Sequence, residues 1–173
     1  LYNMENVKIA VSIPTYRRSD GSTRRLLERA LNSIKTQTYK NYKIFLIGDK
    51  YDDNEEFLEI ANSFYDQSKI YFENLDEAKE RDHYSDKLLL WLYGGINATN
   101  HSIKVALSEG YDYVCHLDHD DYWGNNHLDE IAKCIKDNQS DWVCTKSTYL
   151  NGSILPSIKT DQKYINFLPL PSG

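Results

Sequence analysis

Short apolar runs alternate along this chain with segments whose apolar residues recur every three or four positions. The runs Val7 to Ile13 and Tyr42 to Ile47 are rich in β-branched and aromatic residues, which predicts strands covered on both faces. An amphipathic helix is expected between them, with an apolar stripe of Leu26, Leu27, Ala30, Leu31 and Ile34. The order strand, helix, strand favours a parallel pair of strands.

The same alternation continues toward the end of the chain. Residues 74 to 95 are the least regular part, and we expect a partly helical, mobile excursion there. Asn151-Gly152 is typical of a hairpin turn that sends the chain back antiparallel. The other expected elements are a helix with the stripe Phe57, Leu58, Ala61, Phe64 and Tyr65, a strand at 70 to 72, a helix at 97 to 109, a strand at 111 to 117, a helix at 126 to 136 and a strand at 142 to 149.

Strands that alternate with helices predict a parallel, doubly wound α/β sheet. In that architecture ligands bind beyond the carboxyl ends of the strands. Three predicted loops therefore meet at one edge: Pro14-Thr15-Tyr16, Gly48-Asp49 and Asp118 to Asp121.

Composition narrows the classes of function. The 173 residues are the size of one domain, and a net charge of -6 argues against nucleic acid as a partner. The longest apolar stretch, Leu88 to Tyr93, is far shorter than the ~20 residues of a membrane helix. Glu5 and Lys8 interrupt the first apolar residues, so no signal peptide is expected. The three cysteines, without CxxC spacing, favour buried free thiols in a reducing, cytoplasmic compartment.

The sequence HLDHDDYW, at positions 116 to 123, crowds carboxylates after the predicted strand 111 to 117. In extended backbone Asp118 and Asp120 point to the same side, so both can face one hard cation. Mg²⁺ or Mn²⁺ held in this way takes its other ligands from water and phosphate oxygens. The alternative is a solvated acidic turn without a ligand.

Two further features lie at the same predicted edge. A carboxylate at Asp49 can accept a hydrogen bond from a base N–H or a ribose hydroxyl, although aspartate also begins turns for local reasons. Tyr16 can stack on a planar base or cover the edge of the core. His116, His119 and His127 lie near the acidic cluster and leave a hydrolytic metal site as an alternative.

The chain resembles the nucleotide-binding half of family 2 glycosyltransferases of the GT-A fold over about residues 7 to 150. The resemblance rests on three stretches in order and spacing: VSIPTYRR, LLERALNSIKTQTYKNYKIFLIGD and GGINATNHSIKVALSEGYDYVCHLDHDDYW. It implies a Rossmann-like GT-A fold with a mostly parallel central sheet flanked by helices. It also implies inverting transfer of a sugar to a hydroxyl of a carbohydrate or glycan acceptor. The implied donor is a UDP-sugar, with GDP- or dTDP-sugars as alternatives, and the implied cofactor is Mn²⁺ or Mg²⁺.

The same resemblance implies the residues of the site. Asp120, the first choice, and Asp118 would hold the metal as a D-x-D pair. Asp49 would hydrogen-bond the base. The residues expected to bind the nucleotide are Pro14, Thr15, Tyr16, Asp49, Asn100, Asp118 and His119.

In this family the general base lies downstream, on the acceptor half of the fold. The resemblance assigns no residue of this chain to that role, so we expect the base after Gly173. Residues 1 to 173 are accordingly expected to form a single GT-A-type domain that stops before the complete acceptor-binding part. The alternative functions are a metal-dependent phosphoesterase that uses His116, Asp118, His119 and Asp120, and a noncatalytic nucleotide-binding module.

Overall fold

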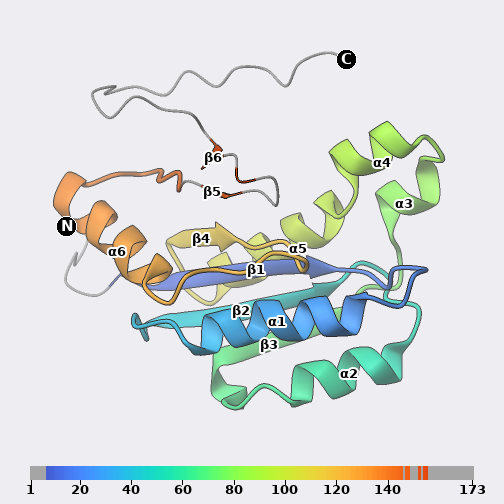
Figure 1. The fold of residues 1–173 in the computed structure, drawn as a ribbon, viewed down its shortest axis with the longest axis horizontal. Coiled ribbons are helices and arrows are strands. Elements are labelled where there is room, and N and C mark those ends of the chain that lie inside the picture. Colours follow the sequence, from blue (N-terminus) through green and yellow to red (C-terminus); the bar gives the residue numbers. More distant parts are fainter. Residues whose placement is uncertain (1–6, 146, 149–151, 153, 156–173) are drawn as a thin grey trace.

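A parallel sheet of four strands forms the centre of the protein (Figure 1). The computed structural model describes residues 7–145, 147–148, 152 and 154–155. The sheet order is β3-β2-β1-β4, and all three neighbouring pairs are parallel. The strands are β1 (Ile9–Thr15), β2 (Tyr42–Gly48), β3 (Ile70–Asn74) and β4 (Tyr113–His116).

Helices cover both faces of this sheet. In chain order the helices are α1 (Thr23–Lys35), α2 (Asn54–Asn62), α3 (Lys79–His83), α4 (Lys87–Tyr93), α5 (Ile96–Ser108) and α6 (His127–Asn138), with a 3-10 turn η1 (Gln67–Lys69) before β3, and α3 and α4 lie off the two faces (Figure 1). Side chains alternate along β1, so Ile9 and Val11 pack with α1, α2 and α6, whereas Ala10 packs with Ala106 of α5. The predicted α/β sheet with a buried first strand is therefore confirmed.

The excursion at residues 74 to 95 is partly helical, as predicted, because it contains α3 and α4. The Asp86 side chain begins α4 by accepting hydrogen bonds from the backbone N–H groups of Leu88 and Leu89, at 2.8 and 3.1 Å. In Figure 1 these two helices stand beyond the carboxyl ends of β1 and β2.

The prediction of one strand from 142 to 149 is wrong. Among the residues of this range that the structure describes, β5 (Ser147–Thr148) is the strand, and it pairs antiparallel with β6 (Ile154–Leu155), apart from the main sheet. The antiparallel return is thus confirmed, although Asn151 lies outside the described residues. The side chains of Trp142 and Cys144 are exposed, so this apolar run lacks the burial that its pattern suggested. The fourth strand is also shorter than the predicted 111 to 117.

The cysteines are free but not fully buried. Cys115 and Cys134 are half-buried, and Cys144 is exposed, which corrects the expectation of buried thiols. Burial raises the pKa of the Cys115 thiol to about 12, so this group stays protonated near neutral pH. Among the described residues, no helix has the length and apolar character needed to span a membrane.

Candidate nucleotide and metal site

The first two segments predicted as loops lie side by side, although Pro14 and Thr15 belong to β1 and Gly48 belongs to β2. In the parallel register Thr15 pairs with Gly48, and the backbone N–H of Asp49 donates to the carbonyl of Thr15 at 2.7 Å. After β4, the N–H of Leu117 donates to the carbonyl of Ser12 at 3.0 Å, so the acidic segment leaves the sheet next to β1. The structure therefore brings the three sequence-predicted segments to one edge.

Asp49 is buried at this edge, with 1% of its surface exposed. Its Oδ2 accepts a hydrogen bond from Nε of Arg81 at 3.0 Å. Burial raises the pKa of the Asp49 carboxyl, and the positive charge of Arg81 opposes this shift. The other oxygen, Oδ1, is buried without a hydrogen-bond partner among the described residues. Asp49 therefore keeps an acceptor for a donor group that enters the site.

Sequence reasoning missed Arg81, on α3. Its guanidinium also donates to the backbone carbonyls of Asp49 and Lys50 and lies over the ring of Tyr16, with Cζ 4.8 Å from the ring centroid. In the sequence it stands in the charged run AKERDH, which is typical of a solvated surface. No local pattern marks it, because its partners lie in the segments that follow β1 and β2.

His119 also contacts the ring of Tyr16. Its ring lies edge-on to Tyr16, with centroids 5.3 Å apart and planes at 81°. Burial lowers the pKa of His119, which favours the neutral imidazole. Nε2 of His119 and Oγ1 of Thr15 are buried and have no hydrogen-bond partner among the described residues. Two more polar atoms next to Tyr16 are therefore available to a ligand.

The acidic segment is a turn, not the extended backbone we expected. The N–H of Asp121 donates to the carbonyl of Asp118 at 3.0 Å, which closes the turn just after β4 ends at His116. Alternation of side chains therefore does not apply at Asp118 and Asp120. Oδ1 of Asp118 lies 2.9 Å from Nε2 of His116, whereas Oδ2 of Asp120 lies 2.9 Å from Nη1 of Arg18.

The carboxyl groups of the acidic turn differ in how easily they ionise. Hydrogen bonding to His116 lowers the pKa of Asp118, so this carboxylate stays ionised. Burial, together with the charges of Asp118 and Asp120, raises the pKa of Asp121. Arg29 donates to the backbone carbonyl of Asp120. An added cation would relieve the repulsion among the three carboxylates.

The turn suits a metal ion that is coordinated partly by protein carboxylates and partly by a bound ligand. Asp118 and Asp120 offer hard carboxylate oxygens at a partly exposed turn, the donor type that Mn²⁺ and Mg²⁺ prefer. Within the described part of the chain, no three His, Cys, Asp or Glu side chains are grouped to hold a metal ion by themselves. In the phosphoesterase alternative, the two imidazoles differ in their surroundings, because His116 is exposed and His119 is buried.

Asn100 is the predicted site residue that belongs to α5. It is exposed on α5 and makes no hydrogen bond to the other predicted residues in the described structure. The start of α5 is nevertheless close to the site, because a Cβ added to Gly95 would lie 3.7 Å from Cβ of Pro14. Gly95 has φ +82°, so glycine permits this entry into the helix.

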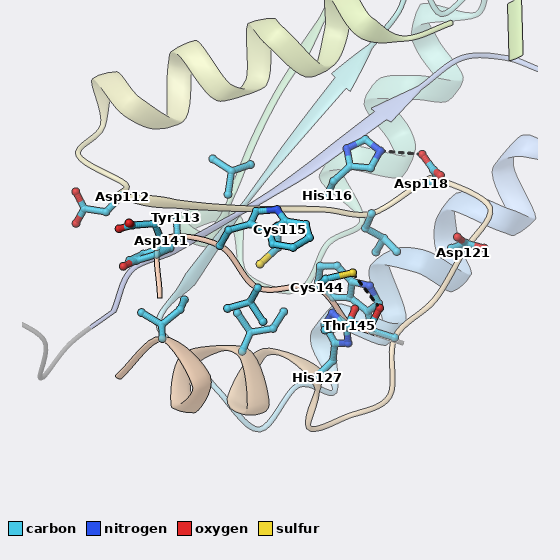
Figure 2. Close-up of a pocket in the computed structure, with 17 residues that line it drawn as sticks. Asp112, Tyr113, Cys115, His116, Asp118, Asp121, His127, Asp141, Cys144 and Thr145 are labelled. Carbon is cyan, nitrogen blue, oxygen red and sulfur yellow. Dashed lines mark hydrogen bonds and ion pairs between the residues drawn. The ribbon is translucent and has the colours of Figure 1, made fainter. Parts of the chain in front are cut away.

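A cavity of about 420 Å³ adjoins the acidic turn, between β4, α6 and residues 141–145 (Figure 2). His116, Asp118 and Asp121 line its end next to the turn. Asp112 and Asp141 line its other end, as Figure 2 shows. The sequence pattern did not reveal this cavity, because it depends on how α6 packs beside the free edge of β4.

Known proteins share this sequence and fold. The model of the family described as "Glycosyl transferase family 2" matches residues 10–170. The chain is 39% identical over 153 residues to the uncharacterized glycosyltransferase R139 of Acanthamoeba polyphaga mimivirus, covering 87% of this chain and 60% of the relative. It is 32% identical over 153 residues to a poly(ribitol-phosphate) beta-glucosyltransferase of Bacillus spizizenii, covering 87% of this chain and 20% of the relative. The chain thus spans 60% or less of the length of these relatives.

Solved structures of S. aureus TarS share the fold. TarS 1–349 in complex with UDP-GlcNAc matches with a TM-score of 0.58 and 19% identity, covering 77% of this chain and 32% of that chain. TarS 1–349 in complex with UDP matches with a TM-score of 0.58 and 18% identity, covering 85% of this chain and 43% of that chain. This likeness confirms the GT-A type of α/β fold. From the match over residues 10–170, this chain belongs to glycosyl transferase family 2.

Proposed function

We propose that this chain forms the donor-binding part of an inverting glycosyltransferase that uses a UDP-sugar and a carbohydrate acceptor. The observation that carries the proposal is the buried Asp49 carboxylate, which has one oxygen on Arg81 and the other without a partner among the described residues. A buried carboxylate with a spare acceptor is costly unless a ligand supplies a donor. Tyr16 stands next to it as a stacking surface.

Uracil matches these groups by its chemistry. Its imide N–H can donate to Oδ1 of Asp49, while Arg81 can donate to a neighbouring carbonyl of the base. The Arg81 guanidinium lies on one face of the Tyr16 ring, so a base that stacks on that face has to displace it. Thymine offers the same imide edge, which keeps dTDP-sugars as an alternative. The complexes of TarS with UDP and UDP-GlcNAc support the choice of uracil.

The acidic turn is the proposed place of the diphosphate. Asp120 and Asp118 would hold Mn²⁺ or Mg²⁺, and the bound cation would supply charge stabilisation for the diphosphate leaving group. Arg18 lies 2.9 Å from Asp120, so its guanidinium can bind a phosphate oxygen when the carboxylate turns to the cation. We assign the general base to no residue of this chain.

Calorimetry with UDP, GDP and dTDP tests the base site. We expect UDP to bind more tightly than GDP, and Asp49→Asn to weaken UDP binding by about tenfold or more, since a hydrogen bond to a charged group contributes ~1.5–3 kcal/mol. Asp52→Asn, a change at an exposed neighbour, should leave the affinity within about twofold. Equal UDP affinity in wild type and Asp49→Asn would refute the base site.

Donor hydrolysis separates an enzyme from a noncatalytic nucleotide-binding module. Release of UDP from UDP-GlcNAc by the 173-residue chain, lost in Asp120→Asn, would exclude the noncatalytic alternative.

A further inference from the structure

The Asp120 carboxylate, the first choice for the metal, is already paired in the described structure. Its Oδ2 accepts a hydrogen bond from Nη1 of Arg18 at 2.9 Å, although the two residues are 102 positions apart in the sequence. Arg29 donates to the backbone carbonyl of Asp120 and lies over the ring of Tyr122, with Cζ 4.9 Å from the ring centroid. Two arginines, one from the loop before α1 and one from α1, therefore hold the side chain and the backbone of Asp120.

The backbone of Arg18 is fixed beside the acidic turn. Its N–H donates to Oγ1 of Thr23 at 2.8 Å, and that hydroxyl donates to the carbonyl of Tyr16 at 3.2 Å. Thr23 begins α1 and is buried, with 1% of its surface exposed. Because these contacts hold the backbone and leave the side-chain torsions free, the guanidinium can turn away from Asp120 and stay at the site.

The ion pair and a divalent cation compete for the same carboxylate. Such a cation binds a carboxylate oxygen at about 2 Å, so a cation on the oxygen that Arg18 holds would lie at most about 5 Å from Nη1. The two side chains are 34% and 44% exposed, so water screens the repulsion between the positive charges incompletely. The ion pair therefore opposes the binding of a cation at Asp120.

We propose that Arg18 exchanges the Asp120 carboxylate for oxygens of the diphosphate, so that the divalent cation and the nucleotide bind cooperatively. This proposal rests on the proposed function, because it takes the acidic turn as the place of both ligands. A diphosphate offers the guanidinium the paired oxygens that it binds best. Once Arg18 has turned to the diphosphate, Asp120 is free to bind the cation. By linkage, UDP tightens Mn²⁺ binding by the same factor by which Mn²⁺ tightens UDP binding.

Electron paramagnetic resonance of Mn²⁺ measures the share of this coupling that Arg18 carries. Bound Mn²⁺ loses the sharp six-line signal of the free ion, so titrating the 173-residue chain gives the Mn²⁺ affinity with and without UDP. A protein-free titration corrects for Mn²⁺ bound by UDP alone. In the wild type we expect UDP to tighten Mn²⁺ binding by about tenfold or more. In Arg18→Met, Mn²⁺ should bind about fivefold more tightly without UDP, and the gain from UDP should be about fivefold smaller.

Arg24→Met is the matched control. It removes the same charge from the start of α1, but Arg24 pairs with Glu28 and Glu59, at 3.1 and 3.0 Å. Its Mn²⁺ affinity should equal that of wild type. Arg18→Gln, which also lacks the charge, should behave as Arg18→Met and carries the test if that variant does not fold. Tighter Mn²⁺ binding is a gain that loss of structure does not produce, and Arg18→Met/Asp120→Asn should abolish it.

The outcomes separate this exchange from the proposed metal site. Equal Mn²⁺ affinities of wild type and Arg18→Met without UDP would overturn the exchange, and so would an equal gain in Arg24→Met. In either case, UDP-dependent Mn²⁺ binding that Asp120→Asn abolishes would still support the proposed function. A wild-type Mn²⁺ affinity that UDP leaves unchanged would contradict both.

Discussion

Nε of Arg81 lies 3.0 Å from Oδ2 of Asp49, although the two residues are 32 positions apart in the sequence. This ion pair joins α3 to the end of β2 and places a charged pair where little water reaches. Because the carboxylate is buried, its ionised form depends on the guanidinium. The pair therefore links α3 to the candidate binding site for the nucleotide base.

Replacing Arg81 should destabilise the protein. Arg81→Met leaves the buried Asp49 charge unpaired, and we expect the free energy of unfolding at pH 7 to fall by about 3 kcal/mol. The double variant Arg81→Met/Asp49→Asn should recover part of this loss, because it removes the orphaned charge. Urea unfolding of the three proteins measures both effects. A loss below about 0.5 kcal/mol in Arg81→Met would show that the pair is not a stabilising contact.

Gly48→Ala should disturb the same end of β2. An added Cβ would collide with the side chain of Asn74 and lie 3.2 Å from its Cα. Oδ1 of Asn74 accepts from the backbone N–H of Tyr51 at 2.8 Å, so its displacement also breaks a turn contact. We expect a loss of about 1–3 kcal/mol in unfolding free energy and weaker UDP binding. Gly124→Ala, where a Cβ has its nearest neighbour 3.7 Å away, is the matched control in thermal unfolding.

Stability should fall below neutral pH because of His127. Burial lowers the pKa of this imidazole, whose ring stacks on Trp123 with centroids 4.4 Å apart. As pH falls through the unfolded value of about 6.5, the unfolded chain takes up a proton that the native state resists, so unfolding becomes easier. The contribution is at most ~1.4 kcal/mol per pH unit. His127→Phe, which keeps a stacked ring, should flatten the dependence of unfolding free energy between pH 8 and pH 5, and an unchanged slope would contradict this role.

Asp120→Asn should remove the metal dependence of nucleotide binding. With Mn²⁺ present, we expect UDP to bind the wild type at least tenfold more tightly than without metal, and the variant to show no such gain. Asp129→Asn, at an exposed position on α6, should behave as wild type. Titration of UDP with and without Mn²⁺ checks both variants, and an equal gain in Asp120→Asn would locate the metal elsewhere.

The strands and main helices were predictable because their signal is local. The β-branched run of β1 and the 3.6-residue stripe of α1 are read from neighbouring residues, and both elements form, although β1 extends through Pro14 to Thr15, beyond the predicted end at Ile13. Parallel order then placed Tyr16, Asp49 and the acidic segment at one edge. The roles of all the predicted nucleotide and metal residues, the extent of one domain over residues 1 to 173 and the cytoplasmic location stay predictions.

Features that depend on distant contacts were not predictable. Arg81 was missed because its partners, Asp49 and Tyr16, belong to other elements. Trp142 was placed in a strand because its neighbours are apolar, yet it is 54% exposed. The orientation of Asp118 and Asp120 was wrong because a backbone turn replaced the extended chain. In each case tertiary packing or turn geometry overrode the local pattern.

A crystal structure of the chain with UDP-GlcNAc and Mn²⁺ tests the proposed donor site most directly. We predict uracil against Tyr16 with its imide N–H on Asp49, and manganese on Asp120 with oxygens of the diphosphate completing its coordination. Density for the nucleotide and the metal on any other face, with Asp49 and Asp120 unliganded, would contradict it.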